Sequence, residues 1–215
     1  MSNTQPERVI AYIDGFNLYF GLKDKGWRRY LWLDLVGMAR DLLKPHQELV
    51  GVKYFTTRVG NHVESVRRQS TYIDALTHHG GVEFVFGNFL WNPIGCDGCG
   101  REWDKREEKQ TDVAIAVHMI CDSLAGAFDT CLLVCGDSDQ VPSVTKLVEE
   151  HGKRVVVACP PERISNHLNS AASAHFVIGR QAFANNQLPD YVTNPDTGYV
   201  LYRPAEWWDA EEQGS

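Results

Sequence analysis

The sequence predicts a three-layer α/β fold, in which helices cover both faces of a mostly parallel central sheet. Apolar runs alternate along the chain with segments of helical periodicity, which is the pattern of parallel strands joined by crossover helices. Most of these runs are too apolar for strands with one face in water. The 215 residues are enough for one sizeable domain with a decorated tail.

Six apolar runs are the expected strands. In chain order they are Val9–Ile13, Gly51–Thr57, Val82–Phe86, Thr130–Cys135, Arg154–Cys159 and a shorter His175–Ile178.

Four segments between these runs are the expected helices. One runs from Asp34 to Leu43 and ends before Pro45, and one follows a capping box with Asn61 at the cap and ends at Gly80. The segment from Thr111 to Leu124 is apolar almost all round, so we expect a central helix there. The last expected helix carries an apolar stripe from Val141 to Val148.

The chain divides into a domain over residues 1–188 and a C-terminal extension over 189–215, which we expect to pack on the domain or on a partner. Residues from about 88 to 108 break the pattern and are expected to form an inserted loop or hairpin. A second hairpin is expected between Tyr191-Val192 and Tyr199–Leu201.

The composition limits the partners. A net charge of −7, from 28 acidic and 21 basic residues, argues against tight non-specific binding to a polyanion. No run approaches the roughly 18 apolar residues of a membrane helix, and the N-terminus lacks the apolar core of a signal peptide. We therefore expect a cytoplasmic protein without a membrane partner. Four cysteines lie in apolar segments and are expected in the core: Cys121, Cys131, Cys135 and Cys159.

Four aspartates are expected at one edge of the sheet. Asp14 follows the first strand, Asp137 and Asp139 follow the strand that ends at Cys135, and Asp112 opens the helix that leads into that strand. The carboxyl ends of parallel strands and the starts of their crossover helices share one edge. Each aspartate alone is equally well explained as a cap or turn residue, but a cap needs one carboxylate and not four.

Such a cluster is costly to ionise unless a cation neutralises it, and Mg²⁺ or Mn²⁺ prefers oxygen ligands. The sequence therefore predicts a metal-dependent phosphodiesterase, with Asn17 as a further ligand or as a residue that orients water. Lys109 would contact the scissile phosphate or the carboxylates.

Three motifs in order resemble the NYN domain family, a branch of the PIN-like nuclease superfamily. They are Tyr12-Ile13-Asp14-Gly15-Phe16-Asn17-Leu18, the stretch from Glu107 to Val113, and the stretch from Val134 to Pro142. The resemblance runs from about Val9 to about Phe183. It implies a PIN-like three-layer fold, a carboxylate-bound Mg²⁺ or Mn²⁺, and cleavage of RNA.

The resulting interpretation is a ribonuclease, an endonuclease in preference to an exonuclease, acting on single-stranded RNA. The expected metal ligands are Asp14, Asp112, Asp137 and Asp139, and Asn17 joins them in the catalytic set. The expected substrate-binding residues are Lys109, Ser138, Arg58 and Arg67. An alternative is a catalytically weak RNA-binding module that keeps the acidic pocket. A phosphotransferase with a covalent aspartate is disfavoured, because no second aspartate lies two residues after Asp14.

Two further expectations concern the insertion. Cys96 and Cys99 form half of a structural zinc site, and a glycine-rich turn with two unpaired thiols is the simpler alternative. The apolar residues of the insertion and the extension, such as Trp91 and Trp208, also suggest a homodimer.

Overall fold

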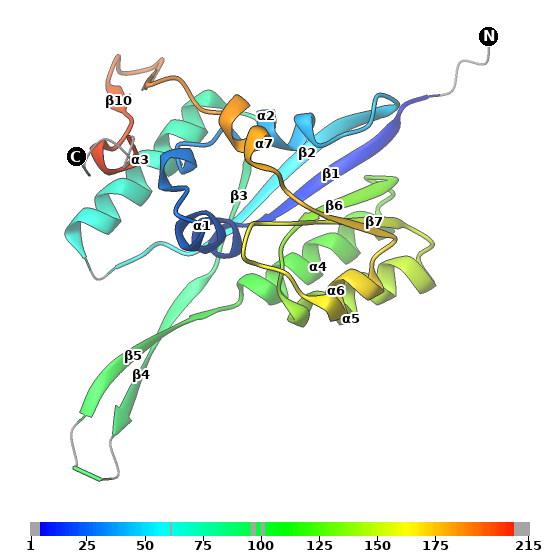
Figure 1. The fold of residues 1–215 in the computed structure, drawn as a ribbon, viewed down its shortest axis with the longest axis horizontal. Helices are drawn as coiled ribbons and strands as arrows, with labels where there is room; N and C mark the ends of the chain where they lie inside the picture. The colour runs from blue at the N-terminus through cyan, green and yellow to red at the C-terminus, as the bar shows by residue number, and fades with distance from the viewer. Residues whose placement is uncertain (1–4, 61, 96–97, 100–101, 209–215) are drawn as a thin grey trace.

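The computed structural model describes residues 5–60, 62–95, 98–99 and 102–208, and for 89–95 and 102–109 it describes the backbone alone. Its sheet has six parallel strands in the order β3-β2-β1-β6-β7-β8 (Figure 1). Their bounds are β1 Glu7–Asp14, β2 Gln47–Thr56, β3 Glu83–Phe86, β6 Thr130–Val134, β7 Arg154–Cys159 and β8 Ala174–Val177. The predicted α/β fold is confirmed, with every expected strand present.

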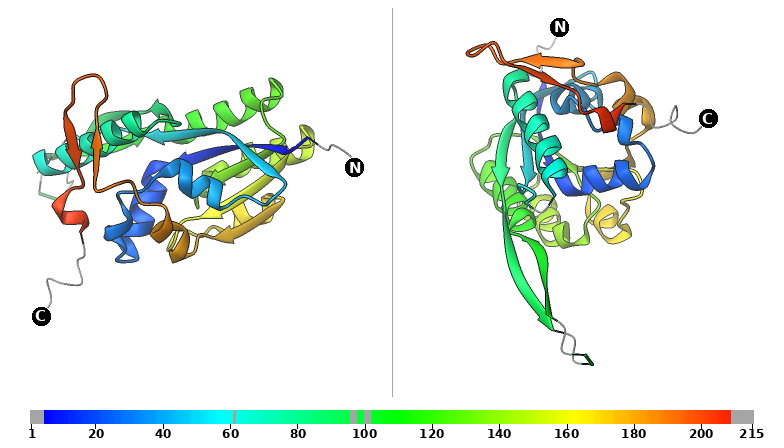
Figure 2. Two further views of the ribbon diagram at one scale, coloured as in Figure 1. Left: turned by 90° about the horizontal axis from the view of Figure 1, so that it is seen from above. Right: turned by 90° about the vertical axis from the view of Figure 1, so that its left-hand side faces the viewer.

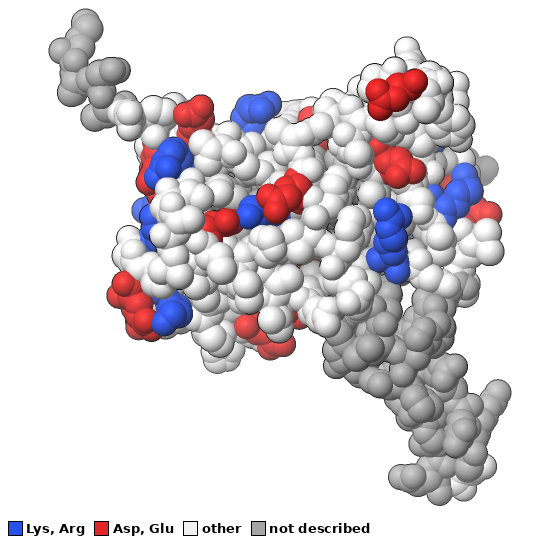
Figure 3. Space-filling view, turned by 180° about the vertical axis from the view of Figure 1, so that it is seen from behind, with Lys and Arg blue, Asp and Glu red and all other residues white. Residues whose placement is uncertain are grey.

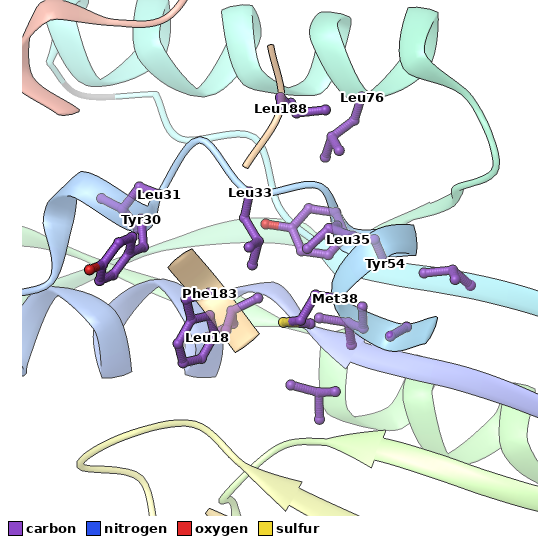
Figure 4. Close-up of a cluster of buried hydrophobic side chains, with 14 of the residues drawn as sticks. Leu18, Tyr30, Leu31, Leu33, Leu35, Met38, Tyr54, Leu76, Phe183 and Leu188 are labelled. Atoms are coloured by element: carbon purple, nitrogen blue, oxygen red, sulfur yellow. The ribbon is translucent and has the colours of Figure 1, made fainter. Parts of the chain in front are cut away.

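Helices cover both faces of this sheet (Figure 1). On one face α1 Gly15–Asp24, α2 Leu35–Asp41, α3 Val63–His79 and α7 Arg180–Asn185 contribute to one apolar cluster, part of which Figure 4 shows. On the other face α4 Thr111–Leu124, α5 Val141–Thr145 and α6 Asn166–Ala171 contribute to a second cluster. A π-helical turn, Lys146–Glu150, extends α5.

The central strand β1 belongs to both clusters. Val9, Ala11 and Ile13 point into the first, whereas Ile10 and Tyr12 point into the second. This alternation follows from the two-residue period of a strand, and it explains why the run is apolar at every position. Burial on both faces fixes β1, and therefore the position of Asp14 at its end.

Two helix predictions need correction. The segment at α4 was expected to be central, but Val113, Val117 and Leu124 are 66%, 51% and 73% exposed, because the helix packs on the sheet through one side only. Cys121 on the same helix is exposed as well, whereas the other three cysteines expected in the core are buried. The N-cap of α3 is His62, without a side-chain cap bond, and the expected cap Asn61 lies outside the described residues.

The insertion is a long antiparallel hairpin of β4 Asn88–Gly95 and β5 Glu102–Lys109, which projects away from the sheet (Figures 1 and 2). Cys96 lies outside the described residues, and Cys99 is exposed with a free thiol. The zinc site stays a prediction.

The C-terminal extension folds back onto the domain. Its two strands, β9 Tyr191–Thr193 and β10 Val200–Tyr202, form the expected hairpin beside α3. Beyond them a 3₁₀ helix, Ala205–Trp207, buries Trp207 against Trp32 and Tyr72, with ring centroids 6.3 Å and 5.8 Å apart. The Trp32 indole also donates a hydrogen bond of 2.7 Å to the Pro189 carbonyl. Dimerisation is not decided by this packing and stays a prediction.

We expect Trp207→Ala to lower the free energy of unfolding by about 3 kcal/mol, because it removes a buried aromatic side chain and leaves a cavity. Trp208→Ala is the matched control, since Trp208 is 48% exposed and its ring contacts the Arg203 guanidinium at 5.1 Å. That loss is worth about 0.5 kcal/mol. Urea denaturation of both variants measures the difference, and equal effects would contradict the docked position of the extension.

Candidate functional site

A hollow of about 660 Å³ lies at the carboxyl edge of the sheet, where β1, β6 and β7 end. Three of the four predicted aspartates line it, together with two more predicted residues: Asp14, Asp112, Asp137, Asn17 and Ser138. The loop after β7 and the first turn of α6 supply much of the remaining wall, through Arg163, Ser165, Asn166 and His167. The convergence of strand ends explains how residues more than a hundred positions apart meet here.

Asp14 is a buried carboxylate held in one orientation. Its Oδ1 accepts hydrogen bonds from the backbone N–H groups of Phe16 and Asn17, both at 3.0 Å, and so caps α1. Its Oδ2 accepts from the Asn17 amide at 2.7 Å and from the Cys135 thiol at 3.5 Å. Burial raises the pKa of Asp14, and the hydrogen bonds from Asn17 oppose that rise.

Asn17 joins the ends of two strands. Its amide nitrogen donates to Asp14, while its Oδ1 accepts from the backbone N–H of Gly136 at 3.2 Å, in the turn after β6. Gly136 in turn lies against the loop after β7, since a Cβ at this position would come within 2.2 Å of the Arg163 carbonyl oxygen. Asn17 therefore fixes the turn that carries Asp137, and only glycine fits at its centre.

Asp137 and Asp139 differ in their positions. Asp137 lines the hollow, and its Oδ1 accepts from the Asp139 backbone N–H at 3.0 Å, which caps the 3₁₀ helix Ser138–Gln140. Asp139 is exposed and does not line the hollow, although its charge reaches Asp112.

Asp112 has no capping role. The N-cap of α4 is Gln110, and Asp112 lies in the first turn of the helix, half-buried. Its pKa is raised to about 6, first by burial and then by the negative charges of Asp14, Asp137 and Asp139, while a hydrogen bond from Gln140 opposes the rise. Asp112 therefore lies among like charges although no helix cap needs it there. Such a position is expected of a carboxylate that binds a cation.

The donor set fits a hard cation, because its ligand atoms are carboxylate and amide oxygens. Within the part of the chain that the structure describes, however, no three His, Cys, Asp or Glu side chains are grouped closely enough to hold a metal ion together. Mg²⁺ commonly binds through one or two carboxylates and keeps several waters. The fit is therefore to a loosely held, partly hydrated ion.

Two of the three basic residues that the sequence indicated, Arg58 and Arg67, lie away from the hollow. Arg58 lies over the Phe86 ring at 5.0 Å, and Arg67 forms an ion pair with Glu64 at 2.9 Å; neither lines the hollow. The Lys109 side chain lies outside the described part of the structure. Among the described residues, Arg163 and His167 are the basic side chains of this wall. On the face shown in Figure 3, described Lys and Arg side chains are scattered among Asp and Glu without a continuous basic strip.

The loop after β7 contributed none of the site residues that the sequence predicted. Its residues lack the repeated acidic pattern that drew attention to the other two strand ends. A signal was present, since Ser165 caps α6 by accepting a 3.3 Å hydrogen bond from Leu168, directly after an expected strand. Only the strand order, which places β7 beside β6, shows that this loop reaches the same edge.

Comparisons with known proteins bear on the family and the fold of the chain. The family model of the NYN domain matches residues 8–179. A 6-hydroxy-3-succinoylpyridine 3-monooxygenase of Pseudomonas putida is 30% identical over 193 residues, and the match covers 74% of this chain but only 61% of that protein. A crystal structure of a protein of unknown function from Vibrio parahaemolyticus shares the fold, with a TM-score of 0.56 and 20% identity. That match covers 87% of this chain and all of the other.

We expect Gly136→Ala to lower the free energy of unfolding by about 2 kcal/mol, because the new methyl group collides with the backbone of the neighbouring loop. Gly179→Ala is the matched control, since no atom lies within 4 Å of its added Cβ. Denaturation in urea measures both. A Gly136 variant as stable as the control would contradict the close approach of the two loops.

The raised pKa of Asp112 predicts a pH dependence of stability. Between pH about 4 and about 6 the folded protein holds a proton on Asp112 that the unfolded chain has released, so its contribution to stability falls as the pH rises. Because Asp112 is half-exposed, we expect a loss of about 1 kcal/mol once screening by solvent is allowed for.

Without divalent cations, Asp112→Asn should therefore be more stable than the parent at pH 7 and lose this advantage near pH 4. Thermal unfolding at both pH values measures the gap. A gap that stays constant or widens toward pH 4 would contradict the crowding of negative charge around Asp112.

Proposed function

Since the chain belongs to the NYN domain family, we propose that it is a metal-dependent ribonuclease whose active site is the acidic hollow. The family is nuclease-like. The observation that carries the proposal is the meeting of Asp14, Asp112 and Asp137 in one hollow, where burial and then the neighbouring carboxylates raise the pKa of Asp112. A cluster of this kind is stabilised when a cation shares the site.

Asp14, Asp112 and Asp137 would hold a partly hydrated Mg²⁺ or Mn²⁺, in part directly and in part through its waters, with Asp139 as a further source of negative charge. The bound ion would supply a water of lowered pKa and neutralise charge on a phosphoryl oxygen. Asp14 is already ordered by its hydrogen bonds, so it loses little freedom on binding. Asp112, which no cap engages, is the carboxylate with the most room to adjust.

The wall residues would position the RNA. The Arg163 guanidinium and the exposed Ser138 stand at the hollow, where they would contact phosphate oxygens. Asn17 would keep the turn of Asp137 in register with Asp14. The hollow is open to solvent, so a single strand would enter from the side without a free end. This supports endonuclease rather than exonuclease action.

Two other functions are open to the same test. An RNA-binding module without turnover would use the same pocket to hold a metal-bridged phosphate. The similarity to a 6-hydroxy-3-succinoylpyridine 3-monooxygenase favours a different candidate, in which this chain acts on a small heteroaromatic acid. The described helices include none long and apolar enough to cross a membrane.

We expect the purified protein to cleave a single-stranded RNA with Mn²⁺ or Mg²⁺ and not with EDTA. Asp137→Asn should lower the cleavage rate by at least about 100-fold. Changing a residue that only supports a metal ligand costs up to about 100-fold, and Asp137 is itself a proposed ligand. Asp196→Asn, the same change in an exposed turn of the extension, should leave the rate unchanged. RNA binding without cleavage would support the binding module instead.

Metal binding has a separate readout in stability. Mn²⁺ at about 100 times its dissociation constant should stabilise the parent protein by about 2.7 kcal/mol, because it binds the folded state alone. Asp137→Asn should show a much smaller rise in melting temperature, and Asp196→Asn the full rise. Equal rises in all three proteins would place the metal elsewhere.

A further inference from the structure

A second cavity, of about 230 Å³, lies next to the acidic hollow. It is enclosed by α1, α3, the segment Leu31–Leu33, the end of β2 and Trp207 of the extension. Phe16 and Phe20 of α1 line both the cavity and the hollow, so the two spaces share a wall. Leu18, Leu31, Leu33 and Tyr54, all of which line this cavity, are labelled in Figure 4.

The lining of this cavity is apolar and aromatic. Four buried leucines line it, Leu18, Leu22, Leu31 and Leu33, together with six aromatic residues: Phe16, Tyr19, Phe20, Tyr54, Tyr72 and Trp207. An apolar cavity of about 150 Å³ is enough to bind benzene. A space of this size and lining therefore fits a single aromatic ring with a short side chain.

The polar groups of the wall have partners within the protein. The Gln69 amide accepts from the Val59 N–H at 2.7 Å and donates to the Thr57 carbonyl at 2.9 Å. The Tyr72 hydroxyl donates to the Leu33 carbonyl at 2.8 Å. Burying the hydrogen-bonding edge of a nucleobase among such groups would leave it unpaired, which is costly. The cavity therefore favours a ring with few polar atoms.

Two partly exposed cations, Arg68 and Lys23, line the cavity; we call this partly exposed side its mouth. The two differ in their partners. Arg68 is held by Glu206, at 2.7 Å, and by the Ser65 hydroxyl, at 3.2 Å. Lys23 has its ammonium group 5.4 Å from the centre of the Phe20 ring, on the wall that the cavity shares with the hollow. Because Glu206 neutralises Arg68, Lys23 is the side chain suited to meet an anionic group of a ligand.

We propose that this cavity binds a small aromatic carboxylic acid, with the ring among the leucines and aromatic rings and the carboxylate beside Lys23. Trp207 lies beyond residues 8–179, which the family model covers, so the extension completes the site. The inference goes beyond the nuclease proposal, because binding here needs neither a metal nor RNA.

The test uses 3-phenylpropanoate, whose flexible linker lets the carboxylate reach the mouth while the ring is enclosed. Calorimetry and ligand-observed NMR on the full chain should show saturable binding, with EDTA present. The uncharged 3-phenylpropanamide and the Lys23→Gln variant should each bind about fivefold more weakly, as expected for one partly exposed ion pair. Lys25→Gln, on a neighbouring lysine that pairs with Glu162, should match the parent.

A second variant tests the ring site. Tyr19 is 37% exposed and lines this cavity but not the hollow, so Tyr19→Ala should fold and bind the acid several-fold more weakly. Adenosine 5′-monophosphate should not displace the acid. The proposal is overturned by the absence of saturable binding, by equal affinities in the parent, Lys23→Gln and Tyr19→Ala proteins, or by displacement with the nucleotide. Loss of RNA cleavage in Asp137→Asn with retained binding of the acid would separate this site from the nuclease.

Discussion

The hydrogen bonds that join Asp14, Asn17 and Gly136 are the interaction on which the rest of the site depends. Asp14 closes the central strand and caps α1, and it receives the Asn17 amide at 2.7 Å. The other end of that amide accepts from Gly136 at 3.2 Å, at the end of β6. Two neighbouring strands are thereby locked together at their carboxyl ends. This link fixes the position of the turn that carries Asp137. The loop after β7 is fixed as well, because the Arg163 backbone packs against Gly136.

This arrangement has an electrostatic cost that a bound cation would remove. Asp14 is buried, and the pKa of Asp112 is raised to about 6 by its own burial and then by the charges of the three other aspartates. Hydrogen bonds compensate Asp14 and Asp137, whose carboxylates cap helices, but Asp112 has no capping bond of this kind. Helix capping therefore explains the positions of the Asp14 and Asp137 carboxylates but not that of Asp112. In the proposed function, charge neutralisation by Mg²⁺ or Mn²⁺ supplies the physical reason for its position.

The strands and their common edge could be predicted from sequence because burial on both faces leaves an unambiguous apolar signature, as in Val9–Ile13. Helix surroundings were less predictable. The apolar sequence of α4 indicated a central helix, yet Val113 and Leu124 are exposed, because periodicity reports which faces are apolar and not which are covered. The contribution of Arg163 was hidden for a different reason: it depends on strand order, which no local pattern specifies.

The acidic hollow and the apolar cavity lie next to each other and differ in chemistry. An acidic hollow suited to a cation and an apolar cavity suited to a ring share Phe16 and Phe20, and the extension closes the second through Trp207. The extension also holds Arg68 through Glu206 and anchors to Trp32 through Pro189. The packing of the extension on the domain therefore helps to form the wall of the apolar cavity.

The most direct test of the central claim is a crystal structure of the protein grown with Mn²⁺, with anomalous scattering measured to locate the ion. The account predicts an anomalous peak in the acidic hollow within coordination distance of Asp14, Asp112 or Asp137 oxygens, about 2.1 Å for a Mg²⁺-like ion. A peak elsewhere, or an empty hollow at a Mn²⁺ concentration that saturates any effect on stability, would contradict it.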